Sequence, residues 1–320
     1  MSTLLLTRSE IETLLDVPAL LPALKEGFKS YTQRTIPAQR GRSLLPKEGS
    51  STTLLYPGLM TGIPAYSVKV HAKFPNENHA IRGLIHLFNS ETGELLAVLE
   101  SSYITAVRTG IASALAAHTL ARQDARTVAV IGAGVQGRWQ IRALAKLRYI
   151  KQVLVFDSSP FVAGRFVAEL AREMDVKLVP VNTLAEALID ADIILSATWS
   201  RSPFLYSGMV NEGAHISTLG ADELGKAETS GDLLEQSLLI CDDRDLAVLQ
   251  GAVGNVGLTA ENIHAELGEV LSGHKRGRQS DDDITVFASV GLAWQDLVAA
   301  WQVYQTALEK GVGERLEFLE

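Results

Sequence analysis

Three cations and one carboxylate in this chain have the chemistry to hold a small substrate that carries both a carboxylate and a nitrogen. The cations are Arg42, Lys69 and Arg108, and the carboxylate is Asp222. A guanidinium can bind a carboxylate through two parallel hydrogen bonds. A lysine that is partly desolvated among other cations has a lowered pKa and can exchange protons. Because an aspartate can stabilise an iminium or protonate a nitrogen, the set predicts a site for an amino or imino acid.

Spacing alone leaves a plainer interpretation open for each residue. Lys69 lies in the alternating segment 65–74, where it would belong to a solvated strand face. Arg108 falls in the first turn of an expected helix, 105–121, where a cation opposes the helix dipole. Such a cation is either placed there for an anion or is an ordinary surface arginine. Asp222 would close an Asx-turn just beyond an apolar run.

A glycine-rich segment in the middle of the chain predicts a dinucleotide site. The β-branched run 127–131 leads into the GAGVQG motif, a helix-compatible segment to about Arg148, and a second apolar run. The first glycine allows a tight turn, the second lets the backbone approach a pyrophosphate, and the third lets helix and strand pack closely. The helix N-terminus offers its N–H groups to the phosphates. The contacts expected here are Gly132, Gly134, Val135, Gln136 and Gly137.

An acidic residue follows this motif at the expected distance. Asp157 stands twenty residues after Gly137, at the end of the second apolar run, where a carboxylate can accept hydrogen bonds from both ribose hydroxyls. It would repel a 2′-phosphate, and two serines rather than a basic residue follow it. The expected cofactor is therefore NAD(H) rather than NADP(H).

From Arg126 onward, strand and helix patterns alternate, which predicts an α/β fold with a Rossmann-type doubly wound parallel sheet. The expected strands after Asp157 are 177–181, 193–197, 214–219, 238–241 and 284–288. Ligands of such sheets lie beyond the carboxyl ends of the strands. The loops 198–200 and 220–226 are therefore candidates, with Thr198 and Gly220 as expected cofactor contacts.

The first 110 residues predict a second, β-rich α+β domain. Two helices are expected within 7–34, the first opened by a T-x-x-E capping box at Thr7 and the second by Pro18. A β-hairpin is expected around 90–93. The segment 291–310 reads as an amphipathic helix whose apolar stripe is formed by Trp294, Leu297, Val298, Trp301, Tyr304 and Leu308.

Composition excludes several classes of function. The net charge of −8, without basic blocks, argues against nucleic acid and anionic membranes as partners. The basic cluster 274–278 precedes three aspartates and is expected to be a solvated loop. One cysteine, Cys241, allows no internal disulfide, which fits a reducing cytoplasm. Neither a signal peptide nor a membrane span is expected. No histidine has a partner at metal-ligand spacing, so no metal is expected.

The chain resembles the ornithine cyclodeaminase/μ-crystallin family over nearly its whole length. The motifs that carry the resemblance are VKV (68–70) with FPNEN (74–78), TAVRTG (105–110), IGAGVQ (131–136), LGAD (219–222) with GKAE (225–228), and VFASVG (286–291) with QDL (295–297).

The resemblance implies roles for the candidate residues. Lys69 and Arg108 would bind the substrate carboxylate with help from Arg42, and Asp222 would be the acid/base group at the reacting nitrogen. Arg42 is chosen by its spacing to Tyr56-Pro57, with Arg40 as the alternative.

Further contacts and an assembly follow from the same motifs. Thr109 and Ser289 are expected at the cofactor. The resemblance also implies a homodimer that pairs strands of the N-terminal domain, to which the C-terminal helix returns. The expected domains are 1–115 with 290–320, for substrate and dimerisation, and 116–289, for NAD.

One departure from the family bears on the substrate. Ornithine cyclodeaminases carry a glutamate shortly before a Met-Pro pair, whereas this chain has TLLYP at 53–57, without an acid. The expected function is therefore an NAD(H)-dependent imino-acid reductase or amino-acid dehydrogenase, with Δ1-pyrroline-2-carboxylate as the first candidate substrate. The alternatives are a cyclodeaminase that uses bound NAD+ and releases ammonia, and a binding protein with little turnover.

Overall fold

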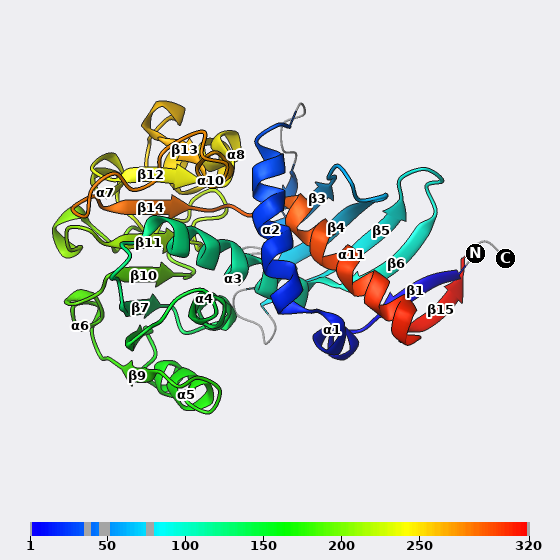
Figure 1. Cartoon of the computed structure of the whole chain (residues 1–320), viewed down its shortest axis with the longest axis horizontal. Helices are drawn as coiled ribbons and strands as arrows, with labels where there is room; N and C mark the ends of the chain where they lie inside the picture. The colour runs from blue at the N-terminus through cyan, green and yellow to red at the C-terminus, as the bar shows by residue number, and fades with distance from the viewer. Residues whose placement is uncertain (1, 35–39, 45–51, 75–79, 319–320) are drawn as a thin grey trace. The chain divides into compact units, whose positions relative to one another are not determined.

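The computed structural model describes residues 2–34, 40–44, 52–74 and 80–318. The chain forms two compact units (Figure 1): a first unit of Met1–Arg108 with Leu292–Glu320, and a second unit of Thr109–Gly291. The chain passes from the first unit to the second inside helix α3 (Ser101–Leu120) and returns after Gly291. Within the described residues, every helix is too short or too polar to cross a lipid bilayer.

The first unit is built on a seven-stranded sheet in the order β15-β1-β6-β5-β4-β3-β2. Its strands are β1 (Ser2–Leu6), β2 (Gly41–Leu44), β3 (Thr52–Gly58), β4 (Ala65–Lys73), β5 (Ile81–Asn89), β6 (Leu95–Glu100) and β15 (Glu314–Glu317). All neighbours are antiparallel except β1 and β6. Helix α11 (Ala293–Lys310) packs on β3, β4 and β5, so the C-terminal helix does return to this unit (Figure 1).

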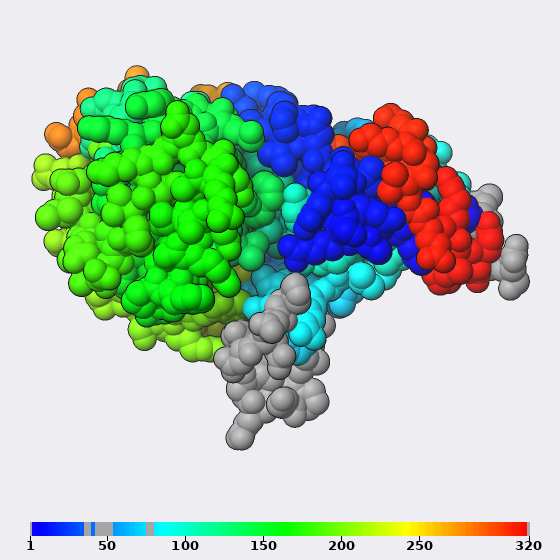
Figure 2. Space-filling model, turned by 90° about the horizontal axis from the view of Figure 1, so that it is seen from below, coloured from blue at the N-terminus to red at the C-terminus, as the bar shows by residue number. Residues whose placement is uncertain are grey.

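The two N-terminal helices lie where the sequence predicts them. In α1 (Arg8–Leu14), the Glu10 carboxylate accepts a hydrogen bond from the Thr7 amide at 2.8 Å, as the capping box requires. Helix α2 (Val17–Tyr31) opens with Pro18 and packs against α11, where the rings of Phe28 and Trp294 meet edge to face. Figure 2 shows this N-terminal segment, in blue, against the C-terminal segment, in red.

Strand β4 alternates as expected, but the polar face is the buried one. Ser67, Lys69, His71 and Lys73 are all buried, while the apolar residues between them are only partly covered. The interpretation of Lys69 as a solvated side chain is therefore wrong. The reason is tertiary, because α11 covers this face of the sheet and brings a carboxylate to Lys69.

Helix α3 begins four residues earlier than expected. The Glu100 carboxylate caps it by accepting hydrogen bonds from the amides of Ser102, at 2.6 Å, and Tyr103, at 3.2 Å. Arg108 consequently lies about two turns into the helix rather than in its first turn. The argument from the helix dipole does not apply to it.

The second unit contains an eight-stranded parallel sheet in the order β13-β12-β14-β11-β10-β7-β8-β9. The strands are β7 (Thr127–Ile131), β8 (Gln152–Phe156), β9 (Lys177–Pro180), β10 (Ile193–Ser196), β11 (His215–Thr218), β12 (Leu238–Cys241), β13 (Ala265–Glu266) and β14 (Thr285–Ala288). The flanking helices are α4 (Val135–Ala145), α5 (Pro160–Leu170), α6 (Leu184–Leu188), α7 (Gly231–Glu235), α8 (Arg244–Gln250), α9 (Ala252–Asn255) and α10 (Leu267–Leu271). The predicted fold class is confirmed, and β13 is the strand that was too short to predict.

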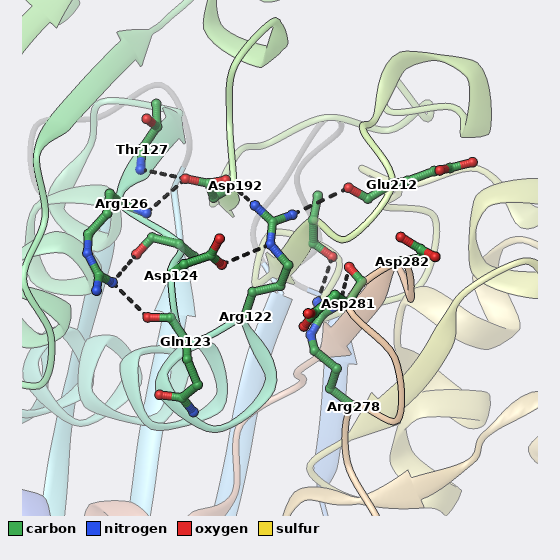
Figure 3. Close-up of polar contacts among 12 residues, drawn as sticks. Arg122, Gln123, Asp124, Arg126, Thr127, Asp192, Glu212, Arg278, Asp281 and Asp282 are labelled. Carbon is green, nitrogen blue, oxygen red and sulfur yellow. Dashed lines mark hydrogen bonds and ion pairs between the residues drawn. The ribbon is translucent and has the colours of Figure 1, made fainter.

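Arginine side chains tie together the amino ends of these strands (Figure 3). The Arg122 guanidinium contacts the carboxylates of Asp124, at 3.1 Å, and Asp192, at 2.7 Å. The second oxygen of Asp192 accepts hydrogen bonds from the amides of Arg126 and Thr127. One acid thus joins the loops that precede β7 and β10.

Arg278 has a similar structural role, so the prediction that 274–278 is a solvated loop is wrong for this residue. It is half-buried and donates to the carbonyl oxygens of Leu120, Ala214 and Ser280. A hollow of about 420 Å³ opens beside it and Arg122. Every guanidinium nitrogen of both arginines already donates to the protein, so this hollow does not have the properties of an anion site.

Candidate active site

Lys69 and Arg108 meet at one carboxylate, that of Asp296. The Lys69 Nζ atom lies 2.6 Å from Asp296 Oδ2, and the Arg108 Nε atom lies 3.0 Å from Oδ1. Lys69 and Asp296 are each 0% exposed, and Arg108 is 4% exposed. Two cations therefore share one anion in the interior of the first unit, and the three side chains together carry a net positive charge whenever Lys69 is protonated.

Neighbouring polar groups fix the orientation of both cations. Arg108 donates through Nη1 to the side-chain oxygen of Gln295 at 2.8 Å. Lys69 Nζ lies 3.4 Å from the hydroxyl of Thr105, which itself donates to the carbonyl of Ser101. The cluster therefore draws on β4, α3 and α11, and α11 supplies two partners of Arg108, Gln295 and Asp296.

The surroundings of Lys69 lower its pKa to about 7. Burial is the largest cause, since it penalises the charged amine. The Asp296 carboxylate opposes this effect, while the positive charges of Arg108 and Arg40 add to it. Both protonation states of Lys69 are therefore populated near neutral pH.

The structure brings Arg40 to the neighbourhood of Lys69. The Arg40 guanidinium carbon and the Lys69 Nζ atom each stand 4.5 Å from the centre of the Tyr56 ring. Arg42 lies on β2, where its backbone pairs with Leu54, but its side chain is outside the described part of the structure. The role of Arg42 at the substrate carboxylate remains a prediction. The position of Arg40 near Lys69 supports Arg40 as the alternative.

The sequence interpretation gave Asp296 no role, and the expected apolar stripe of α11 was only partly correct. Trp301 and Tyr304 are half-buried, and Leu308 is 42% exposed. The first two turns of the helix are buried on all sides, and the buried residues are Trp294, Gln295, Asp296, Leu297, Val298, Ala299, Ala300, Val303 and Ala307. Asp296 stands three and four residues before the buried Ala299 and Ala300. This helical spacing was the feature of the sequence that could have indicated a buried Asp296.

Asp222 lies in the second unit, in the loop that follows β11. Its Oδ1 atom is 3.1 Å from Nζ of Lys226, and its side chain is 25% exposed. Lys226 is held in turn 4.5 Å from the centre of the Trp199 ring. The side chain of Asn255 fixes the intervening turn by donating to the carbonyls of Glu223 and Lys226 at 2.8 Å.

The three glycines of the GAGVQG motif have the geometry that their predicted roles require. Gly132 has φ +94°, and a Cβ there would lie 2.5 Å from the Ala197 carbonyl. A Cβ on Gly137 would lie 2.4 Å from the carbonyl of Gly132, so α4 packs tightly on β7. A Cβ on Gly134 would meet nothing within 4 Å. The second glycine thus faces open space, which fits the approach of a pyrophosphate.

Asp157 holds the end of β8 next to this loop. Its carboxylate accepts hydrogen bonds from the amides of Ala133 and Ser159, both at 2.9 Å. In the helix that follows the glycines, Val135 is 54% exposed, and the buried Gln136 Oε1 has no hydrogen-bond partner within the described residues. These groups fit a bound dinucleotide, which would take its ribose at Asp157 and its phosphates at the amides of the loop.

Several of the remaining residues expected at the cofactor already form hydrogen bonds within the protein. The amides of Thr198 and Gly220 both donate to the Glu228 carboxylate. The Ser289 hydroxyl donates to Asp242 at 2.7 Å. Thr109 opens the second unit within α3. Contacts of these residues with a cofactor remain predictions, and those of Thr198 and Gly220 would have to use atoms other than the amide nitrogens.

A parallel sheet with a glycine-rich first turn, in a chain whose other unit buries two cations on one carboxylate, defines a nucleotide-binding α/β protein of two units. The chain belongs to the ornithine cyclodeaminase/mu-crystallin family, whose model matches residues 1–311. The resemblance expected from the motifs is thereby confirmed.

Individual relatives are similar along most of their length. The chain is 34% identical to a Δ1-pyrroline-2-carboxylate reductase of Bacillus cereus, over 84% of this chain and 85% of the relative. It matches the Thermococcus litoralis Δ1-pyrroline-2-carboxylate reductase, solved with NADH and L-proline, with a TM-score of 0.92 and 31% identity over 98% and 100% of the two chains. An archaeal alanine dehydrogenase dimer with bound NAD matches with a TM-score of 0.91 and 32% identity over 100% of both chains.

Proposed function

We propose that this protein is an NAD(H)-dependent oxidoreductase that transfers hydride between nicotinamide and the C=N bond of a small imino acid. The observation that carries the proposal is the buried cluster of Lys69, Arg108 and Asp296, in which two cations share one carboxylate. A substrate carboxylate would balance the remaining positive charge. The enzyme names and bound cofactors of the relatives and structural neighbours support the same reaction class.

The proposed substrate is a small cyclic ketimine, Δ1-pyrroline-2-carboxylate in the first instance. A substrate with a distal amine would need an acid in the TLLYP stretch, and none is present. Tyr56 is instead buried, with its ring beside Arg40 and Lys69. The product L-proline is the ligand held by the Thermococcus litoralis neighbour.

Each residue has a defined task in this mechanism. Lys69 and Arg108 bind the substrate carboxylate and orient the C=N bond. The Asp222 carboxylate, paired with Lys226, stabilises the protonated imine, because an adjacent negative charge favours the iminium. The glycine loop and Asp157 would hold NADH, which would supply a hydride to the imine carbon. The Asp222 carboxylate would keep the proton on the nitrogen, so that the product is the amine.

In this proposal the substrate and dimer contacts belong to the domain 1–115 with 290–320, and the cofactor belongs to 116–289. The apolar face of the first unit's sheet supports a homodimer. Leu55, Val70 and Leu84 are paired across β3, β4 and β5, so their side chains share one face. Leu55 and Leu84 are each 44% exposed. Such a row of partly exposed apolar side chains suits a second subunit.

Light scattering at micromolar concentration tests the dimer. The wild type is expected to have the mass of two chains, and Leu84→Asp to have the mass of one. Leu249→Asp, at a residue that is 65% exposed in the second unit, is the matched control and should leave the mass unchanged. A monomeric wild type would contradict the proposed assembly.

The reaction is tested by following NADH absorbance with a panel of imines. The panel contains the cyclic ketimines of proline and pipecolate, and pyruvate, glyoxylate or oxaloacetate with ammonia or methylamine. Rapid oxidation with one imine would support the reductase and identify its substrate. Ammonia release from ornithine and NAD+ without net NADH formation would instead indicate a cyclodeaminase. Tight NADH binding without turnover would favour a binding protein.

The role of Asp222 is tested by Asp222→Asn. Turnover should fall by about 10²- to 10⁴-fold, the range for loss of a proton-handling group. NADH affinity should stay nearly unchanged, because Asp222 acts on the substrate nitrogen. Asp190→Asn, at an exposed acid of the same unit, is the control. Normal turnover of Asp222→Asn would remove this residue from the mechanism.

A further inference from the structure

We infer that Glu228 is a positioning residue that joins the loop after β10 to the loop after β11 and thereby holds Asp222 in place. Its side chain is 0% exposed in the second unit, outside every role described above. The inference rests on the proposed function for its effect on turnover, but the contacts stand by themselves.

The Glu228 carboxylate accepts three hydrogen bonds. Oε1 accepts from the amide of Thr198 at 2.6 Å, and Oε2 accepts from the amide of Gly220 and the hydroxyl of Thr218, both at 2.8 Å. Thr198 follows β10 and Gly220 follows β11, which are neighbouring parallel strands. A single carboxylate therefore bridges the carboxyl ends of two strands, the edge at which ligands of such sheets bind.

The fit between Glu228 and Gly220 is tight. A Cβ at Gly220 would lie 2.4 Å from Glu228 Oε1 and 2.5 Å from the Thr198 carbonyl oxygen. Only glycine can occupy this position while the carboxylate keeps its three partners. The glycine is thus explained by the close approach of a side chain of the protein itself.

The backbone of Glu228 is anchored as well, since its carbonyl accepts hydrogen bonds from the amides of Phe204 and Leu205 at 3.0 Å. Hydrogen bonds of Glu228 therefore hold both ends of the segment from Gly220 to Glu228. Asp222 lies within this segment and is paired with Lys226. Any displacement of Glu228 would move the first end of this segment and, with it, Asp222.

The same bonds determine what this edge can bind. The amides of Thr198 and Gly220 are both engaged by Glu228, so they do not form an anion site. In this inference phosphate recognition is left to the loop of Gly132–Gly137.

Glu228→Gln tests the inference, because the amide has nearly the same size but presents an NH2 group to one of the donors. We expect kcat with the reactive imine to fall at least tenfold. The KM for the imine should change less than threefold, since Lys69 and Arg108 lie in the other unit. NADH fluorescence titration should show affinity weakened at least fivefold, because the two loops that Glu228 joins stand at the edge of the sheet where ligands of such folds bind.

Asp232→Asn is the matched control. Asp232 is an exposed acid of the same unit that accepts a hydrogen bond from the Ser207 hydroxyl at 2.7 Å, without contact to the two strand ends. It should leave kcat, KM and NADH affinity unchanged. If Glu228→Gln fails to fold, Thr218→Val tests the inference instead, because it removes one hydrogen-bond donor and keeps the Glu228 carboxylate. We expect it to lower kcat about threefold.

The outcomes separate this inference from the proposed function. A folded Glu228→Gln with wild-type kcat and wild-type NADH affinity would overturn it, as would unchanged values in Thr218→Val where that variant decides. A lowered melting temperature with unchanged kinetics would reduce Glu228 to a structural residue and also overturn it. If none of the imines in the panel leads to NADH oxidation by the wild type, the proposed function fails. The NADH titration of Glu228→Gln then still tests the role of Glu228.

Discussion

The ammonium of Lys69 and the carboxylate of Asp296 lie 2.6 Å apart in the interior of the first unit, although 227 positions separate them in the sequence. Burying either charge alone would be costly, and removing one partner of such a pair leaves the other without compensation. Asp296 also contacts Arg108, so a single acid makes two buried cations tolerable.

Asp296→Asn should therefore destabilise the protein and weaken substrate binding. We expect the free energy of unfolding to fall by about 3–5 kcal/mol, the range for breaking a buried ion pair. The KM for the imine should rise, because the Asp296 carboxylate supports the protonated form of Lys69. Urea unfolding and steady-state kinetics measure the two effects. Glu309→Gln, at an exposed acid of the same helix, should change stability by less than about 0.5 kcal/mol.

The pKa of Lys69 near 7 predicts a pH dependence. Only the ammonium form attracts the substrate carboxylate, so kcat/KM should fall as the pH rises through about 7. Lys69→Arg keeps its positive charge across this pH range, so its kcat/KM should not fall as the pH rises through about 7. Initial rates from pH 6 to 9, corrected for ionisation of the imine, provide the measurement. A wild-type profile that is flat across this range would contradict the assignment.

Stability depends on the same group in the opposite direction. The unfolded chain has a lysine of pKa 10.5, so between about pH 7 and pH 10.5 it binds a proton that the folded protein does not. The contribution of Lys69 to stability therefore rises with pH across this window.

Asp157→Ser should shift the cofactor preference toward NADPH, because it removes a negative charge that would repel the 2′-phosphate. We expect the ratio of kcat/KM for NADPH to that for NADH to rise about tenfold, or ~1.4 kcal/mol. Activity with NADH should also fall, since the carboxylate that accepts from Ala133 and Ser159 is lost. Asp175→Ser, at an exposed acid of the same unit, controls for net charge. An unchanged ratio would count against Asp157 as the ribose ligand.

His215 makes the second unit sensitive to acid. Burial, with the charges of Arg278 and Arg148, lowers its pKa to about 3 from 6.5. Between these values the unfolded chain takes up a proton that the folded protein excludes, so stability falls as the pH falls from about 6.5 toward 3. His215→Gln should reduce the pH slope of the unfolding free energy by up to about 1.4 kcal/mol per pH unit. Urea unfolding at pH 7 and pH 5 measures it, with the exposed His274→Gln as control.

The parts of the fold that local patterns determine could be predicted from the sequence. The glycine turn, the strand–helix alternation and the capping box at Thr7 each depend on a few neighbouring residues. The start of α3 was placed too late, because the Glu100 cap lies at the end of a strand and carries no helical signal of its own. Arg278 was misread because its partners are distant carbonyl groups.

The candidate site was less accessible to local reasoning. Lys69 and Arg108 were joined through the family resemblance, since their spacing contains no information on contact. Asp296 was not assigned a role, because an acid in the first turn of a helix is favourable for the helix dipole alone. Whether the polar face of β4 is solvated or buried stayed open, because alternation defines two faces and only the packing of α11 decides which of them is covered.

The discontinuity of the first unit has a consequence during protein synthesis. After Lys69 is made, 227 further residues must be added before Asp296 exists, which takes roughly 10–50 seconds at about 5–20 residues per second. Strands β7 to β13 are made in that interval, whereas β14, which pairs with both β11 and β12, ends only eight residues before Asp296. The nascent chain therefore completes its parallel sheet and supplies the partner of Lys69 within the same last stretch of synthesis, and until then the cations of β4 and α3 lack the carboxylate that allows them to be buried.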